Sequence, residues 1–150
     1  MQPSLEEPLP RVVVLTGKAI REYFEEALAE EGASLATWVV LYGVERGGWD
    51  NQRNLAKDLR IEGSTLTRHL DRMEHDGLIV RTRDPEDRRQ IRVDLTPKGD
   101  ETFRRLKSVA QNTGRRAMTG VSASDQAALR RILDRIRVNV GGDRADERSA

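Results

Sequence analysis

The fold is decided by residues 51–99, which read NQRNLAKDLRIEGSTLTRHLDRMEHDGLIVRTRDPEDRRQIRVDLTPKG. This stretch predicts two short helices, two strands joined by a charged turn, and the start of a third helix. Apolar residues recur at helical spacing in the second helix and mark its buried face: Ile61, Leu66, Leu70 and Met73. The opposite face carries hydrogen-bonding or cationic side chains: Ser64, Thr65, Arg68, Arg72 and His75. Such a helix suits a position against a core, with its outer side in a DNA major groove.

Two strands follow this helix. Gly77 can take the left-handed conformation that ends a helix, and the first strand is expected over residues 78–83. Alternating apolar residues mark the second strand: Ile91, Val93 and Leu95. The turn between them, residues 84–89, reads DPEDRR and is too polar to be buried. A helix-turn-helix followed by a two-stranded, arginine-tipped wing is a winged helix.

The run STLTRHLDRMEHDGLIVR, followed by DRRQIRVDLTPKG, resembles the multiple-antibiotic-resistance-regulator (MarR) family of bacterial transcription factors. The most specific part is D-x-R at Asp87 to Arg89, followed by V-x-L-T-x-x-G at Val93 to Gly99. The match is tight over this central stretch, and the flanking helices fit the family's layout more loosely. The resemblance implies a homodimeric, sequence-specific DNA-binding regulator. We expect a ligand-responsive repressor that binds a pseudo-palindromic operator on double-stranded DNA.

The composition narrows the class of protein. With 26 Lys and Arg residues against 25 acidic residues, the net charge is +1, so nucleic-acid binding must depend on where the charges lie. Aromatic residues make up 4% and charged residues 34%, which favours a helical protein over a sandwich or barrel. With the two strands predicted above, the expected fold class is mainly α with a small two- to three-stranded antiparallel sheet. Cysteine is absent, which excludes disulfides and thiol sensing. The longest apolar run, Val12 to Leu15, is too short to span a membrane, and a cytoplasmic location is expected.

The chain divides around the central module. We expect an N-terminal arm and dimerisation helix over residues 1–34, and the winged helix-turn-helix over residues 35–95. C-terminal dimerisation helices should occupy residues 96–142, where Gly141-Gly142 ends the last helix, and a disordered tail should follow over residues 143–150. A lone monomer could not cover the apolar sides of its terminal helices, and a symmetric dimer would.

Helix starts are predicted from capping residues. Ser34, Asn51 and Thr96 each precede a predicted helix and can accept a hydrogen bond from its first turn. Ser122 with Asp125 resembles a capping box, with aspartate in the usual glutamate position.

Candidate DNA contacts on the second helix lie mostly in its first turns: Ser64, Thr65, Thr67, Arg68 and Arg72. Arg68 is best suited to a guanine, because its guanidinium matches O6 and N7. Two alternatives remain open. Thr65 and Thr67 can instead bond locally to the backbone, and Arg68 can pair with Asp71 or line a ligand pocket.

Candidate contacts on the wing rest on the resemblance. It implies that Arg89 inserts into the minor groove, that Asp87 holds Arg89 in orientation, and that Arg88 contacts phosphate. Two arginines on a polar turn are otherwise simply solvated.

A small-molecule effector is also implied by the resemblance, since family members commonly respond to phenolic or other anionic aromatic ligands. Trp38 and Tyr42 are expected near the junction of dimer domain and wing module, where Arg68 or Arg81 could meet a carboxylate or phenolate. The competing interpretation is that Trp38 is a core residue and that Arg81 is a cation on the surface of a strand. A subgroup that responds to purine-like acids has an acidic residue after this tryptophan, where this chain has Val39.

Catalytic and cofactor motifs are absent from the sequence. It contains no glycine-rich phosphate loop, no G-x-S-x-G and no H-E-x-x-H, so we expect neither an enzyme nor a cofactor. His69 and His75 fall on different faces of one helix, and no metal site is expected. The main alternative function is a winged-helix module that binds protein and lacks specific DNA binding.

Overall fold

The computed structural model describes residues 7–47 and 52–146. The chain forms two compact units, Met1–Thr113 and Gly114–Ala150. Within the described residues no helix is both long and apolar enough to cross a bilayer.

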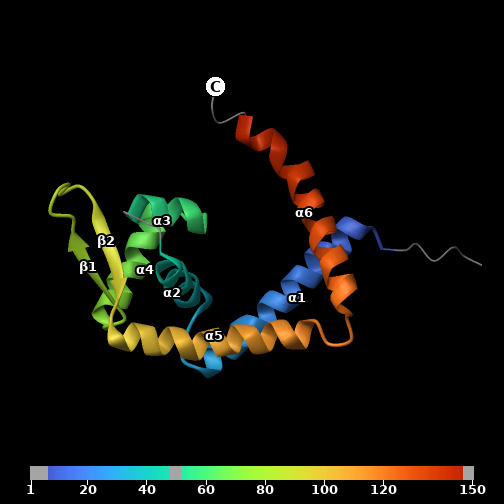
Figure 1. Cartoon of the computed structure of the whole chain (residues 1–150), viewed down its shortest axis with the longest axis horizontal. Helices are drawn as coiled ribbons and strands as arrows, with labels where there is room; N and C mark the ends of the chain where they lie inside the picture. The colour runs from blue at the N-terminus through green and yellow to red at the C-terminus, as the bar shows by residue number, and fades with distance from the viewer. Residues whose placement is uncertain (1–6, 48–51, 147–150) are drawn as a thin grey trace, which may run out of the picture. The chain divides into compact units, whose positions relative to one another are not determined.

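The first unit contains most of the secondary structure (Figure 1). Its elements are α1 (Leu9–Glu30), α2 (Leu35–Arg46), α3 (Gln52–Leu59), α4 (Gly63–His75), β1 (Ile79–Arg83), β2 (Ile91–Leu95) and the greater part of α5 (Pro97–Ala117). The second unit contains the end of α5 and α6 (Ala123–Asp146). A mainly helical chain with one small antiparallel sheet confirms the predicted fold class.

The sheet is a two-stranded antiparallel hairpin. Ile79 at the start of β1 lies opposite Leu95, and Arg83 at its end lies opposite Ile91. Ile79 is buried, whereas Val80 beside it is exposed, which is the alternation expected when one face of a sheet covers a core. The hairpin therefore packs its base into the first unit and extends its polar turn outward as the wing.

The core gathers around α4, which packs with α2, α3 and β1. Leu66 and Leu70 of α4 have no exposed surface, and Met73 is 3% exposed. The other buried apolar side chains come from α1, α2, α3, β1 and α5: Leu28, Val40, Leu41, Leu55, Ala56, Ile79, Phe103 and Leu106. Ile61, which was predicted to belong to α4, precedes its first residue, Gly63, and is partly buried against the same core. The predicted apolar face of α4 is therefore its buried face.

Three of the predicted caps lie among the described residues and are formed: Ser34, Ser122 and, as shown below with α5, Thr96. The Ser34 hydroxyl accepts from the Thr37 N–H at 3.2 Å at the start of α2. At the start of α6, the Ser122 hydroxyl accepts from the Asp125 N–H at 3.1 Å and donates to its carboxylate at 2.6 Å. Asn51, the predicted cap of α3, lies outside the described residues.

The last helix is longer than the sequence predicted. α6 continues through Gly141-Gly142 to Asp146, so the predicted helix end and the predicted start of the tail at residue 143 lie too early. Glycine inside a helix costs about 1 kcal/mol relative to alanine, but it does not prevent the helical conformation. Residues 123–146 contain no proline that would end the helix.

The start of α5 packs closely against the turn before β1. This close packing explains why the last position of the V-x-L-T-x-x-G motif, Gly99, is a glycine. Thr96 caps α5 by accepting from the Gly99 N–H at 3.0 Å, and its hydroxyl donates to the Gly77 carbonyl at 2.5 Å. A Cβ on Gly99 would lie 1.9 Å from the carbonyl oxygen of Leu78. Because that obstacle is backbone, it cannot move aside as a flexible side chain can.

Gly99→Ala should therefore lower the free energy of unfolding by about 1–3 kcal/mol, the usual cost of overpacking. The matched control is Gly114→Ala, also in α5, where an added Cβ meets nothing within 4 Å. That change should raise the free energy of unfolding by about 0.5–1 kcal/mol. Urea unfolding of the three proteins measures both effects, and equal stability of the two variants would contradict the steric explanation.

Candidate DNA-binding site

Three polar side chains form a row along α4, on the side away from the core. Ser64, Arg68 and Arg72 are spaced by four residues, which puts them above one another on a helix. All three are exposed, and the Arg72 side chain is 84% exposed. Its nearest carboxylate oxygen, on Asp76, is 4.0 Å away, so this pair holds the side chain weakly. The row presents two guanidinium groups and a hydroxyl to solvent.

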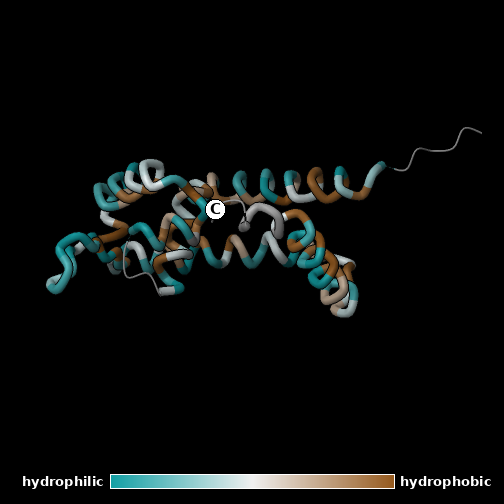
Figure 2. Tube along the Cα trace, turned by 90° about the horizontal axis from the view of Figure 1, so that it is seen from above, coloured by the Kyte–Doolittle hydropathy of each residue, from teal (hydrophilic) through white to brown (hydrophobic). Residues whose placement is uncertain are grey.

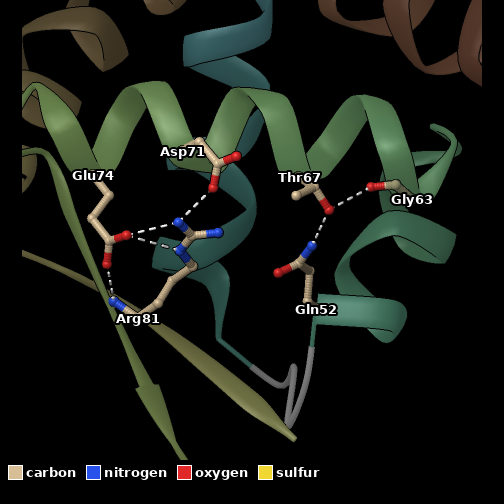
Figure 3. Close-up of polar contacts among 6 residues, drawn as sticks. All are labelled: Gln52, Gly63, Thr67, Asp71, Glu74 and Arg81. Atoms are coloured by element: carbon tan, nitrogen blue, oxygen red, sulfur yellow. Dashed lines mark hydrogen bonds and ion pairs between the residues drawn. The ribbon is translucent and has the colours of Figure 1, made fainter.

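Thr65 and Thr67 lie on either side of this row and have different surroundings. Thr65 is half-buried. The Thr67 hydroxyl donates to the Gly63 carbonyl at 2.9 Å and accepts from the side-chain amide of Gln52 at 2.6 Å (Figure 3). This is the local backbone bond named as the alternative for Thr67. Gln52 was not predicted, because its role depends on how α3 packs against α4.

Arg81 of β1 is held by two carboxylates of α4 (Figure 3). Its guanidinium lies 2.6 Å from Asp71 and 2.7 Å from Glu74, and its side chain is only 18% exposed. Its backbone N–H also donates to Glu74, at 3.1 Å. The hydrogen bond between the two side chains lowers the pKa of Glu74 and raises the pKa of Arg81. Both groups are therefore ionised at neutral pH.

The wing turn is shaped by aspartate side chains. Asp84 accepts from the backbone N–H of Glu86 at 2.8 Å. Asp87 accepts from the backbone N–H of Arg89 at 3.0 Å, and its other oxygen accepts from the side chain of Gln90 at 3.2 Å. The Asp87 carboxylate thus contacts the backbone of Arg89, whereas the sequence led us to expect that it would hold the side chain.

The tip of the wing exposes both Arg88 and Arg89. Arg89 also lines a hollow of about 460 Å³ between the wing and the start of α3, together with Gln52, Arg53, Gln90 and Ile91. Arg53, which the sequence did not single out, therefore lies near the wing arginine. Two guanidinium groups at one hollow make this a surface suited to anions.

Trp38 and Tyr42, two of the predicted ligand residues, belong to an aromatic cluster. The Trp38 ring stacks on Phe103 with 5.8 Å between centroids and meets Phe24 edge-on at 5.9 Å. Tyr42 lies 5.4 Å from Trp38, and the Arg46 guanidinium lies 5.6 Å from the Tyr42 ring. The cluster joins α1, α2 and α5.

A second hollow, of about 550 Å³, lies where the turn between α1 and α2 meets α4 and α5. Its lining is Gly32, Ala33, Ser34, Thr37, His69, Arg72, Met73, Asp76, Leu78, Lys98, Thr102 and Arg105. Three of these side chains are cations and only one is a carboxylate. The predicted ligand residues Trp38, Tyr42, Arg68 and Arg81 are not part of this lining. Sequence patterns could not find the hollow, because its walls come from distant parts of the chain.

No group of three or more His, Cys, Asp or Glu side chains able to hold a metal ion occurs in the described parts of the chain. His69 faces the second hollow and His75 is exposed.

Comparison with known proteins identifies the family. The MarR family model matches residues 34–91. The uncharacterized HTH-type transcriptional regulator YdgJ of Bacillus subtilis (strain 168) is 30% identical over 123 residues, which cover 82% of this chain and 73% of YdgJ. The crystal structure of the transcriptional regulator PA3341 has a TM-score of 0.77 at 33% identity, covering 90% of this chain and 99% of PA3341.

Two further structures share the fold and have known ligands. A mutant of MarR from E. coli in complex with operator DNA has a TM-score of 0.77 at 24% identity, covering 86% of this chain and 93% of that one. BpsR of Bordetella bronchiseptica, whose DNA binding is regulated by 6-hydroxynicotinic acid, has a TM-score of 0.76 at 19% identity, covering 91% and 97%. With its winged helix and its match to YdgJ over most of its length, this chain belongs to the MarR family of DNA-binding transcriptional regulators.

Proposed function

We propose that this protein is a homodimeric repressor that binds a pseudo-palindromic operator and releases it when a small aromatic anion binds. The observation that carries the proposal is the exposed row on α4, which lies on a helix whose opposite face is fully buried. Ser64 and Arg68 are in the first turns, the end of a recognition helix that reaches base edges. Arg68 would contact a guanine, and Arg72 a base or phosphate.

The wing would contact DNA beside the recognition helix. Arg89 is exposed at the turn, where a guanidinium can enter a narrow minor groove and meet its negative potential. Asp87 would support this by fixing the backbone at Arg89. Arg88 would contact phosphate, and Arg53 would do so from α3 across the hollow that it shares with Arg89. Affinity should therefore fall as salt rises.

The proposed partner of the terminal helices is a second copy of this chain. Hydrophobic residues recur along α1 and α6 between hydrophilic ones (Figure 2). Many of them are exposed in a single chain: Leu9, Val12, Val13, Val14, Leu15, Ile20 and Tyr23 on α1, and Leu129, Ile132, Leu133, Ile136, Val138 and Val140 on α6. Apolar surface of this extent is characteristic of an interface. A two-fold dimer would bury these faces and give one particle two recognition helices.

The proposed effector site is the hollow between α1, α2, α4 and α5. Its cationic side chains, Arg72, Lys98 and Arg105, favour a carboxylate. BpsR, which shares this fold, responds to an aromatic acid. Because Arg72 also belongs to the exposed row of α4, a ligand here would act directly on the surface that meets DNA. The ligand would weaken operator binding by the difference between its binding free energies for the free protein and for the DNA-bound protein.

The wing is tested by Arg89→Ala, which should weaken operator binding by about 1–3 kcal/mol, with an unchanged fold because the side chain is exposed. Asp87→Ala should cost less, since it acts only through the turn. An operator duplex selected from random sequence and fluorescence anisotropy at fixed salt give the affinities. Arg104→Ala, which removes an exposed guanidinium from α5, is the charge-matched control. Wild-type affinity in Arg89→Ala would rule out the minor-groove role.

The effector site is tested with salicylate as the probe. At millimolar concentration it should weaken operator binding and raise the melting temperature of the free protein. Arg105→Ala should blunt both responses, because Arg105 lines the hollow. Arg104→Ala should leave them intact, although it too removes a paired guanidinium from α5. A full response in Arg105→Ala would exclude the hollow, and no response to any of a panel of aromatic acids would exclude this effector class.

A further inference from the structure

A second polar row runs along α4, beside the exposed one. It consists of Thr67, Asp71 and Glu74, whose side chains all point toward neighbouring elements (Figure 3). From helical geometry this row lies between the exposed row and the buried face. We call these three residues, with their partners Gln52 and Arg81, the tether residues.

The tether residues make two contacts that hold α4, one near its start and one in its second half. Near its start, Thr67 accepts from the Gln52 side chain at 2.6 Å, which links α4 to α3. In its second half, Asp71 and Glu74 bind the same guanidinium of Arg81, which links α4 to β1. The second tether is the stronger, because charge-assisted hydrogen bonds to a mostly buried guanidinium exceed a neutral one. β1 leads directly into the wing turn, so this tether joins the recognition helix to the wing.

The apolar contacts of α4 decide which of its faces points inward, but they tolerate small rotations of the helix about its own axis. Leu66, Leu70 and Met73 would stay buried through a small rotation, because the hydrophobic effect has no preferred direction. Hydrogen bonds do have a preferred direction. A guanidinium held by two carboxylates one helical turn apart therefore adds a directional constraint that fixes α4 more closely relative to β1.

We propose that Glu74 and Asp71, acting through Arg81, are positioning residues for operator recognition. They fix α4 against the wing so that Arg68 and Arg89 reach their grooves at the same time. This inference rests on the proposed mode of DNA binding. It gives a role in DNA recognition to two acidic residues of α4, although their negative charge would by itself repel DNA.

Because these residues are negatively charged, the direction in which operator affinity changes when a carboxylate is removed tests the proposal. Removing a carboxylate from a DNA-binding surface should strengthen binding to any DNA through electrostatics alone. A positioning role predicts the opposite for the operator, with no loss for unrelated DNA. A merely structural role would change stability and leave the ratio of the two affinities unchanged.

The variant is Glu74→Gln, which keeps the size of the side chain and an acceptor for the Arg81 backbone N–H. Its control is Glu101→Gln, which makes the same charge change at an exposed position of α5. The probes are the duplex that the wild-type chain selects from random sequence and a scrambled duplex of equal length. We expect Glu74→Gln to lower the ratio of operator to scrambled affinity by about tenfold, with Glu101→Gln at the wild-type ratio.

A double-variant cycle with Arg81→Met tests whether Glu74 acts through Arg81. The loss of operator-binding free energy in Glu74→Gln/Arg81→Met should be smaller than the sum of the losses in the two single variants. The reason is that each single substitution already removes the same contact between residues 74 and 81. A wild-type ratio in Glu74→Gln, or fully additive losses, would overturn the proposal. If the wild-type chain selects no sequence at all, the proposed DNA-binding mode fails first, and the inference falls with it.

A measurement without DNA tests the contact between Glu74 and Arg81 separately from DNA binding. The Nε–H of Arg81 donates to Glu74 at 3.1 Å, so its proton should exchange slowly with water in the wild-type protein. In Glu74→Gln the exchange should become much faster while the melting temperature changes little. Equal exchange rates in the two proteins would show that the tether does not hold in solution, and would overturn the proposal whatever the DNA result.

Discussion

The burial of one face of α4 is the interaction on which the rest of the structure depends. Leu66 and Leu70 are fully buried and Met73 is nearly so. Each such side chain contributes up to about 1.5–3 kcal/mol, and together they outweigh any single surface contact of this helix. With this face fixed inward, the row of Ser64 and Arg68 can only face outward. The apolar pattern thus determines which residues the helix presents to a partner.

Charge acts through its location, because the chain as a whole is nearly neutral. Asp71 and Glu74, which would repel DNA, are paired with the mostly buried Arg81. Four exposed arginines, Arg68 and Arg72 on α4 and Arg88 and Arg89 on the wing, belong to the surface that we propose meets DNA. This division offsets the cost of acidic residues on a recognition helix.

Local patterns predicted most of the fold and part of the candidate site. The apolar face of α4 and the caps at Ser34 and Thr96 follow from residues a few positions apart, which is the range that sequence periodicity reports. The contact of Gln52 with Thr67 joins elements whose relative position depends on tertiary packing, and no local signal reports it. The same holds for Arg81, whose partners belong to the preceding helix and became evident only in the folded chain.

In the proposed complex, two recognition helices and two wings engage one operator together. Footprinting of the selected operator by dimethyl sulfate, which reports guanine N7 in the major groove, and by hydroxyl radicals, which report the minor groove, tests it most directly. We predict two major-groove protections related by two-fold symmetry and about one helical turn apart, each flanked by a minor-groove protection. A single asymmetric protected region, or major-groove protection without the flanking minor-groove signal, would rule out this mode of binding.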